Sequence, residues 1–202
     1  MFRRDATAIR NAAAASPEAT AQVIIFAVLT ANAGFGMAVK AARWVQDNVD
    51  TLPASYHDIP DSDRSVMAAA MSGAKLQAAR EIWANRHEIY AKRESMDAMD
   101  FWHYAIDNVR GLGMVKAAFV VQMLYNEMGC IDAHNIRMMG YDKVMLTGKS
   151  KVRRQNYLSL QSVKTSQAWW DDWCDFVAKR YPKQFTSGDE VSRLHTVAVL
   201  GE

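Results

Sequence analysis

The stretch Arg110-Gly-Leu-Gly-Met-Val-Lys-Ala-Ala118 decides the fold that we expect for this chain. The residues before it, about Met99–Val109, and those after it, about Met114–Met128, have the apolar spacing of helices. The Gly-x-Gly between them is typical of a tight turn, because glycine adopts backbone dihedrals that other residues avoid. We therefore expect a helical hairpin over residues 99–128.

The rest of the chain also favours helices. Alanine, methionine, glutamine and lysine are frequent, there are four prolines and ten glycines, and strand signals are nearly absent. Ser16-Pro17-Glu18 predicts a helix that begins after an N-cap serine and runs to about Thr30. Further helices are expected at about 37–49, 65–71, 74–90, 132–140 and 161–180, with a loop or joint at 51–63 and a basic connector at 148–156. The sequence thus predicts an all-α fold.

Composition excludes several classes of protein. The chain has 202 residues, of which 50% are hydrophobic and 23% charged, and its net charge of +2 limits any nucleic-acid surface to a local patch. Cys130 and Cys174 are not clustered, which excludes a cysteine-ligated iron–sulfur cluster, fits a reducing cytoplasm and suggests no metal site. The apolar run Ala21–Ala31 is shorter than the ~20 residues of a membrane span. The N-terminus lacks the pattern of a signal peptide, so we expect a cytoplasmic protein without a membrane partner.

The hairpin has the features of a phosphate-binding site. The first N–H groups of its second helix have no partner within the helix, and the positive end of the helix dipole favours an anion. Gly111 and Gly113 would leave the backbone open to a phosphate, and Lys116, one turn further, would add a positive charge. An ordinary joint between two helices would carry the same glycine pair, so this alternative stays open.

Asp132 follows the hairpin at the start of the next predicted helix. As an N-cap it would accept a hydrogen bond from that helix. The same position aims the carboxylate at the helix mouth, where a nucleotide held by the hairpin would arrive. His134 follows two residues later and either orients a substrate or packs.

These stretches resemble the helix–hairpin–helix DNA glycosylase superfamily. Gly111-Leu-Gly-Met-Val-Lys-Ala117 followed by Ile131-Asp-Ala-His134 is similar to the family pattern L-P-G-V-G-x-K-T-A and then V-D-T-H. Phe26-Ala-Val-Leu-Thr-Ala-Asn-Ala33 resembles its L-L-S-x-Q-T stretch, with Asn32 in place of the glutamine that probes the gap left by a flipped base. Gly73–Ile82 resembles the helix that leads to the hairpin, so the likeness covers about Val23 to Met139.

The resemblance implies a fold and an activity. It implies a two-lobed helical fold in one domain over 1–202, with an N-terminal lobe at about 17–90 and a C-terminal extension at 141–202. Its partner would be double-stranded DNA, and Asp132 would catalyse hydrolysis of the N-glycosidic bond of a flipped, modified or damaged base. The family implies no organic cofactor, although hairpin carbonyls would suit a monovalent cation. Short chains with a tail like Trp169-Trp-Asp-Asp-Trp-Cys-Asp-Phe176 resemble phage-encoded members, which act in the host cytoplasm.

Two departures from the family pattern change what we expect of the hairpin. The family's Schiff-base lysine aligns with Val115, and Lys116 lies one residue further, about 100° around the helix. We therefore expect Lys116 to contact a phosphate and the enzyme to be monofunctional, without lyase activity. Arg110 stands where the family has proline.

A basic run lies beyond the resemblance. Lys149, Lys151, Arg153 and Arg154 either contact phosphates that flank the flipped base or form a solvated loop. Of these, Lys151, Arg153 and Arg154 are our candidate DNA contacts.

Three other functions remain open. The first is a phage enzyme of the same fold that hypermodifies a DNA base, using Asp132 with a different nucleophile or leaving group. The second is a non-catalytic helix–hairpin–helix DNA-binding protein in which Asp132 is a cap. The third is a helical scaffold or virion component.

Overall fold

The computed structural model describes residues 10–11, 13–31, 33, 35–67, 70–140 and 150–180. These residues form helices and, within the described ranges, no strands, so the all-α prediction is confirmed. The elements are α2 (Pro17–Leu29), α3 (Phe35–Asp47), the 3₁₀ turns η1 (Val49–Thr51) and η2 (Tyr56–Asp58), α4 (Asp61–Met67), α5 (Gly73–Ala84), α6 (Arg86–Ser95), α7 (Ala98–Asn108), α8 (Met114–Tyr125), α9 (Ala133–Met138), α10 (Lys151–Gln161) and α11 (Ser166–Arg180).

Helix α2 is the centre of the fold. It begins as the sequence predicts, with Pro17 in its first turn and the Ser16 hydroxyl accepting a hydrogen bond from Ala19 N at 3.1 Å. Every residue from Thr20 to Leu29 is buried, which is the pattern of a helix covered on all sides. It packs against α3, α5, α6 and α8.

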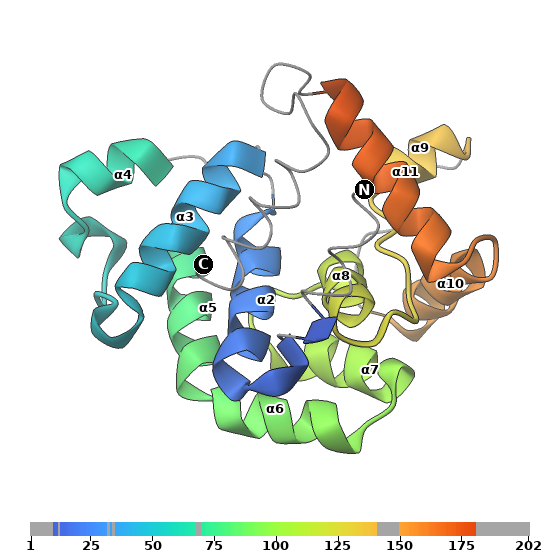
Figure 1. Cartoon of the computed structure of the whole chain (residues 1–202), viewed down its shortest axis with the longest axis horizontal. Helices are drawn as coiled ribbons and strands as arrows, with labels where there is room; N and C mark the ends of the chain where they lie inside the picture. The colour runs from blue at the N-terminus through green and yellow to red at the C-terminus, as the bar shows by residue number, and fades with distance from the viewer. Residues whose placement is uncertain are drawn as a thin grey trace.

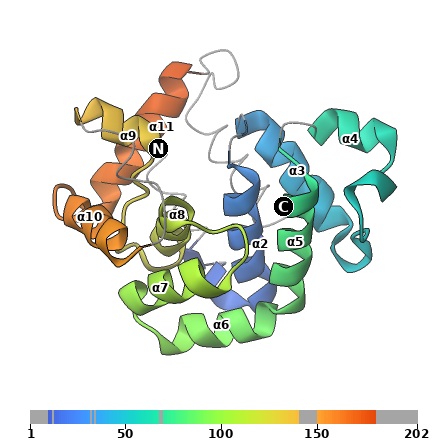
Figure 2. The ribbon, with the colours of Figure 1, turned by 180° about the vertical axis from the view of Figure 1, so that it is seen from behind.

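The other helices surround α2. Helices α3 and α4 lie on one side of it and α8 to α11 on the other, while α5, α6 and α7 form an arc that joins the two sides (Figures 1 and 2). The buried apolar residues form one cluster that extends from Ala13 to Trp170. Within the described residues, no helix is both long enough and apolar enough to cross a membrane.

The predicted helical hairpin is confirmed as α7 and α8, which pack against each other. The Asp97 side chain accepts a hydrogen bond from Asp100 N and starts α7. Asn126 has a left-handed backbone (φ 62°) and ends α8, three residues before the predicted end. The buried Trp102 of α7 donates its indole N–H to Met114 O at 3.0 Å, which fixes the first turn of α8.

Two predictions about helices are wrong. The single helix expected at 74–90 is two helices, because Asn85 leaves the helical backbone (φ −98°, ψ 14°) between α5 and α6. The basic connector expected at 148–156 is largely helical, since α10 begins at Lys151 after Ser150, whose hydroxyl accepts a hydrogen bond from Arg153 N. The terminal helix accordingly begins later than expected, at Ser166. Residues 51–63 contain η2 and the start of α4 as well as loop.

Candidate functional site

The two glycines of the hairpin turn have different surroundings. Gly111 has φ +85°, and a Cβ atom there would lie 3.1 Å from Val28 Cγ1 and 3.4 Å from Ala78 Cβ. Gly113 has an extended backbone (φ −108°, ψ −179°), and within the described chain no atom lies within 4 Å of the place where its Cβ would be. Gly111 is therefore required by the turn and its packing, whereas Gly113 leaves space in front of α8.

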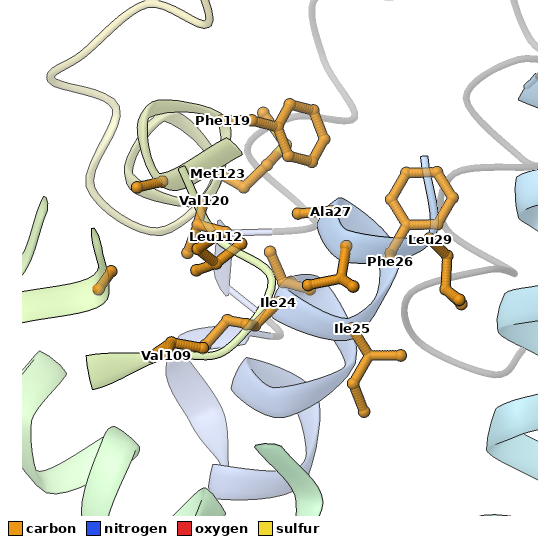
Figure 3. Packing of buried hydrophobic residues seen from close by; sticks show 14 of the residues in the cluster. Ile24, Ile25, Phe26, Ala27, Leu29, Val109, Leu112, Phe119, Val120 and Met123 are labelled. Carbon is orange, nitrogen blue, oxygen red and sulfur yellow. The ribbon is translucent and has the colours of Figure 1, made fainter. Parts of the chain in front are cut away.

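The turn packs against α2 through apolar side chains. Val109 and Leu112 are buried and face Ile24, while Phe119 and Val120 of α8 lie beside the same helix (Figure 3). The hairpin is thus fixed to the centre of the fold.

The outer side of the turn carries a carboxylate. Arg110 Nε donates to Glu81 Oε2 at 2.7 Å, and both side chains are about half exposed, at 52% and 41%. A cavity of about 210 Å³ beside this pair is also lined by Glu88. Since these carboxylates disfavour phosphate, this cavity is a poor nucleotide site.

Lys116 points toward the end of α2. Its Nζ donates to Thr30 Oγ1 at 2.7 Å, and the Thr30 hydroxyl donates to Ala27 O at 2.8 Å. Burial lowers the pKa of Lys116, while the nearby Cys130 and Asp132 raise it. Burial has the larger effect, so the pKa of Lys116 lies below its ordinary value, and the contact of Lys116 with a phosphate stays a prediction.

Asp132 caps α9, as its sequence position predicts. Asp132 Oδ1 accepts a hydrogen bond from Asn135 N at 2.9 Å, and its carbonyl oxygen accepts one from Ile136 N at 3.0 Å. The residue is partly buried. Asp132 thus lies at the start of α9, and its charge is one of those that act on the Lys116 amine.

Side chains from other helices hold the backbone before Asp132. The Gln161 amide donates to Gly129 O (2.9 Å) and accepts from Gly129 N (2.8 Å), while Gln122 Oε1 accepts from Cys130 N (3.2 Å). The Tyr157 hydroxyl accepts from Ile131 N at 3.1 Å and donates to Gly129 O at 3.3 Å. These contacts fix the position from which Asp132 enters α9.

Three aromatic side chains of α10 and α11, those of Tyr157, Trp169 and Trp170, pack near this segment. Trp169 and Trp170 are both buried, and Trp169 lies directly against Gly129. The Tyr157 ring stacks on Trp102 of α7, with centroids 5.7 Å apart. The C-terminal helices therefore connect Asp132 to the hairpin.

Lys75 was missed as a site residue by the sequence reasoning. It lies on α5, and its Nζ donates to the carbonyl oxygens of Leu29 (3.0 Å), Ala31 (2.6 Å) and Ala70 (3.0 Å). Burial lowers the pKa of Lys75, and the charge of Lys116 lowers it further. The Gly73–Ile82 stretch contained this lysine, but nothing in its spacing indicated that it reaches the end of α2.

The basic side chains at the start of α10 differ in their exposure and in their contacts with the protein. Lys151 is exposed and Arg153 is partly exposed. The Arg154 guanidinium pairs with the Asp107 carboxylate of α7, with one contact at 2.9 Å, and lies 3.2 Å from His103 Nδ1. The contact with Asp107 raises the pKa of Arg154. Arg154 thus joins α10 to the hairpin, and Lys151, Arg153 and Arg154 all stay candidates for DNA contact.

Some predicted residues lie outside the described structure. Asn32 and Lys149 are among the residues without a described position, and so is the side chain of His134. A monovalent cation at the hairpin also stays a prediction. In the described ranges, no group of three His, Cys, Asp or Glu side chains could hold a metal ion.

Comparisons with known proteins leave the family open: no family model, curated protein or solved structure matches this chain.

Proposed function

We propose that this protein is a DNA glycosylase-like enzyme that hydrolyses the N-glycosidic bond of a modified or damaged base flipped out of duplex DNA. The observation that supports it best is the order of the elements: the α7–α8 hairpin, whose Gly113 leaves space in front of α8, is followed by Asp132 at the cap of α9. The charge of Asp132 also favours the protonated form of Lys116, although burial lowers the pKa of that lysine. The resemblance of residues 111–117 and 131–134 to the glycosylase pattern supports the same proposal.

In this proposal the hairpin holds the DNA backbone. The N-terminus of α8 has no side-chain cap among the described residues, and the space in front of Gly113 is open. Its N–H groups and the positive end of its dipole are suited to a phosphate oxygen. Lys151 and Arg153 on α10 would contact flanking phosphates.

Asp132 carries the chemistry. As the base leaves with the electron pair of the glycosidic bond, positive charge develops on the sugar and the Asp132 carboxylate stabilises it. The same carboxylate orients a water molecule and accepts its proton as the oxygen bonds to the sugar.

The test compares the wild type with Asp132→Asn on duplexes that carry a panel of damaged and modified bases. Free base is measured by mass spectrometry and DNA binding by fluorescence anisotropy. Asparagine is as good an N-cap as aspartate, so stability should change by less than about 0.5 kcal/mol. Base release should fall roughly a hundredfold or more, because the charge that stabilises the sugar is lost.

The matched control is Asp100→Asn, which removes an exposed carboxylate on α7. This variant should release base at the wild-type rate. Equal base release by wild type and Asp132→Asn would overturn the mechanism. DNA binding by both proteins with no release of any base would instead favour a binding module or a base-modifying enzyme.

A second candidate is a base-modifying enzyme of the same fold, and the surroundings of Lys116 favour it. A lysine whose pKa is lowered by burial holds more of the neutral amine, which is the nucleophilic form. Here the Lys116 amine would attack a modified base that bears a leaving group, and the leaving group would depart with the bonding electrons. We therefore expect the rate of adduct formation to rise with pH, because more of the Lys116 amine is neutral, and to level off above the lowered pKa of Lys116. Mass spectrometry of a protein–DNA adduct that Lys116→Gln abolishes would distinguish this reaction from hydrolysis.

A further inference from the structure

The end of α2 is held by a lysine from another helix. The last carbonyl groups of a helix have no partner within the helix, and the negative end of its dipole favours a cation there. Helix α2 has no basic residue in its last turn, and Lys75 of α5 supplies the cation instead. Its ammonium has three donors, and Leu29 O, Ala31 O and Ala70 O accept all three.

Thr30 lies between two of these carbonyl groups. Because Lys75 binds the residue on each side of it, the backbone of Thr30 is fixed relative to α5. The Thr30 hydroxyl donates a hydrogen bond to Ala27 O and accepts one from Lys116 Nζ at 2.7 Å. Lys75 therefore determines where the acceptor for Lys116 stands.

The charged and titratable groups around Lys116 come from three parts of the chain. The charge of Lys116 lowers the pKa of Lys75 of α5, and repulsion between like charges acts on both partners. Asp132 at the start of α9 favours the charged amine. Burial raises the pKa of Cys130 to about 12, so its thiol is neutral near pH 7.

We propose that Lys75 is a positioning residue for Lys116: it fixes Thr30 as the acceptor of the Lys116 amine and opposes protonation of that amine. Lys75 thereby keeps one N–H of Lys116 directed at Thr30 and favours the neutral amine. The proposal rests on the second candidate function in one respect, that the Lys116 amine takes part in the reaction.

The experiment measures Lys116 itself and uses no DNA. The protein is labelled with acetic anhydride at a series of pH values, and peptide mass spectrometry follows the labelling of each lysine. In Lys75→Met the midpoint for Lys116 should rise by about one pH unit, which corresponds to roughly tenfold less neutral amine at a given pH. Lys75→Arg keeps the positive charge and should restore most of the wild-type profile.

The control variant is Lys40→Met, which removes one exposed positive charge from α3 and should leave the Lys116 profile unchanged. An identical Lys116 midpoint in wild type and Lys75→Met, or an equal shift in Lys40→Met, would overturn the proposal. Because no DNA is present, absence of base release in the glycosylase assay does not affect this result. If base release depends on Asp132 but the Lys116 midpoint is unchanged in Lys75→Met, the positioning role of Lys75 is wrong and the glycosylase mechanism is unaffected.

A second measurement covers the case in which Lys75→Met does not fold. In the wild type labelled with ¹³C and ¹⁵N on lysine, the side-chain signals of Lys75 and Lys116 are followed by NMR against pH. Two charges that oppose each other titrate in coupled steps, so each signal should report both events. Independent single-step titrations would contradict the proposal.

Discussion

The hairpin turn at 109–113 and the segment at 129–132 both lead to a candidate site residue, but they are held in different ways. The turn is held by apolar packing, with Leu112 buried and Gly111 against Val28. The segment is held by hydrogen bonds that Tyr157, Gln161 and other side chains make to its backbone. The position of the turn is therefore set by the packing of neighbouring helices. The position of the segment depends largely on Tyr157 and Gln161 of α10, a helix that comes later in the chain.

The largest expected effect is at Gly129, where the segment also depends on shape. A Cβ atom there would lie 2.6 Å from Trp169 Cβ and closer still to atoms of the indole ring, so the whole buried ring would have to move. We expect Gly129→Ala to lower the free energy of unfolding by about 3 kcal/mol, measured by urea denaturation.

Gly36→Ala is the matched control for this variant. Gly36 lies in α3, and among the described residues no atom is within 4 Å of the place its Cβ would take. Alanine should be neutral there or stabilise the protein by up to about 1 kcal/mol. Equal stability of the two variants would show that Trp169 does not constrain the segment.

The hairpin turn should tolerate alanine at one glycine and resist it at the other. Gly111→Ala forces a left-handed backbone on a residue with a Cβ and crowds Val28, so we expect a loss of about 2 kcal/mol in unfolding free energy. Gly113→Ala should change stability by less than about 1 kcal/mol, because its backbone is extended and its surroundings are open. Similar thermal unfolding of the two variants would contradict the packing explanation for the turn.

The smallest effect is expected at a single hydroxyl. Tyr157→Phe keeps the ring that stacks on Trp102 but removes one of the two acceptors of Ile131 N, which then keeps only Gly129 O at 3.0 Å. The cost should be about 1 kcal/mol, and hydrogen exchange at the Ile131 amide should become faster.

Tyr104→Phe provides the comparison for that hydroxyl. Within the described residues, the Tyr104 hydroxyl makes no hydrogen bond, so its loss should leave the stability and the Ile131 exchange rate unchanged. If Tyr157→Phe behaved in the same way, the segment would be held by packing as the turn is.

The sequence predicted most of the helices because their signals are local. The N-cap Ser16, the glycines of the hairpin and the cap Asp132 each act on residues within one turn of themselves. The errors arose where local signals mislead. Asn85 ends α5 within an apolar pattern that continues through it, without a glycine or proline to mark the break. Residues 148–156 were expected to be a connector because they are basic and polar, although α10 begins among them.

The candidate site was less predictable, because its contacts join distant parts of the chain. Asp132 was found from its place after the hairpin, but the direction of Lys116 depends on where α2 lies relative to α8. The same holds for Lys75, whose three acceptors belong to other elements. Spacing along one helix carries no information about such contacts.

The burial of α2 has a consequence for synthesis of the chain. Its buried residues Thr20–Leu29 leave the ribosome well before α5, α6 and α8, three of the helices that cover them. Helix α2 is thus exposed while these partners are still being made, and it becomes protected once Tyr125 has emerged. Nascent chains that end before α8 should accordingly be substrates for chaperones that bind apolar segments.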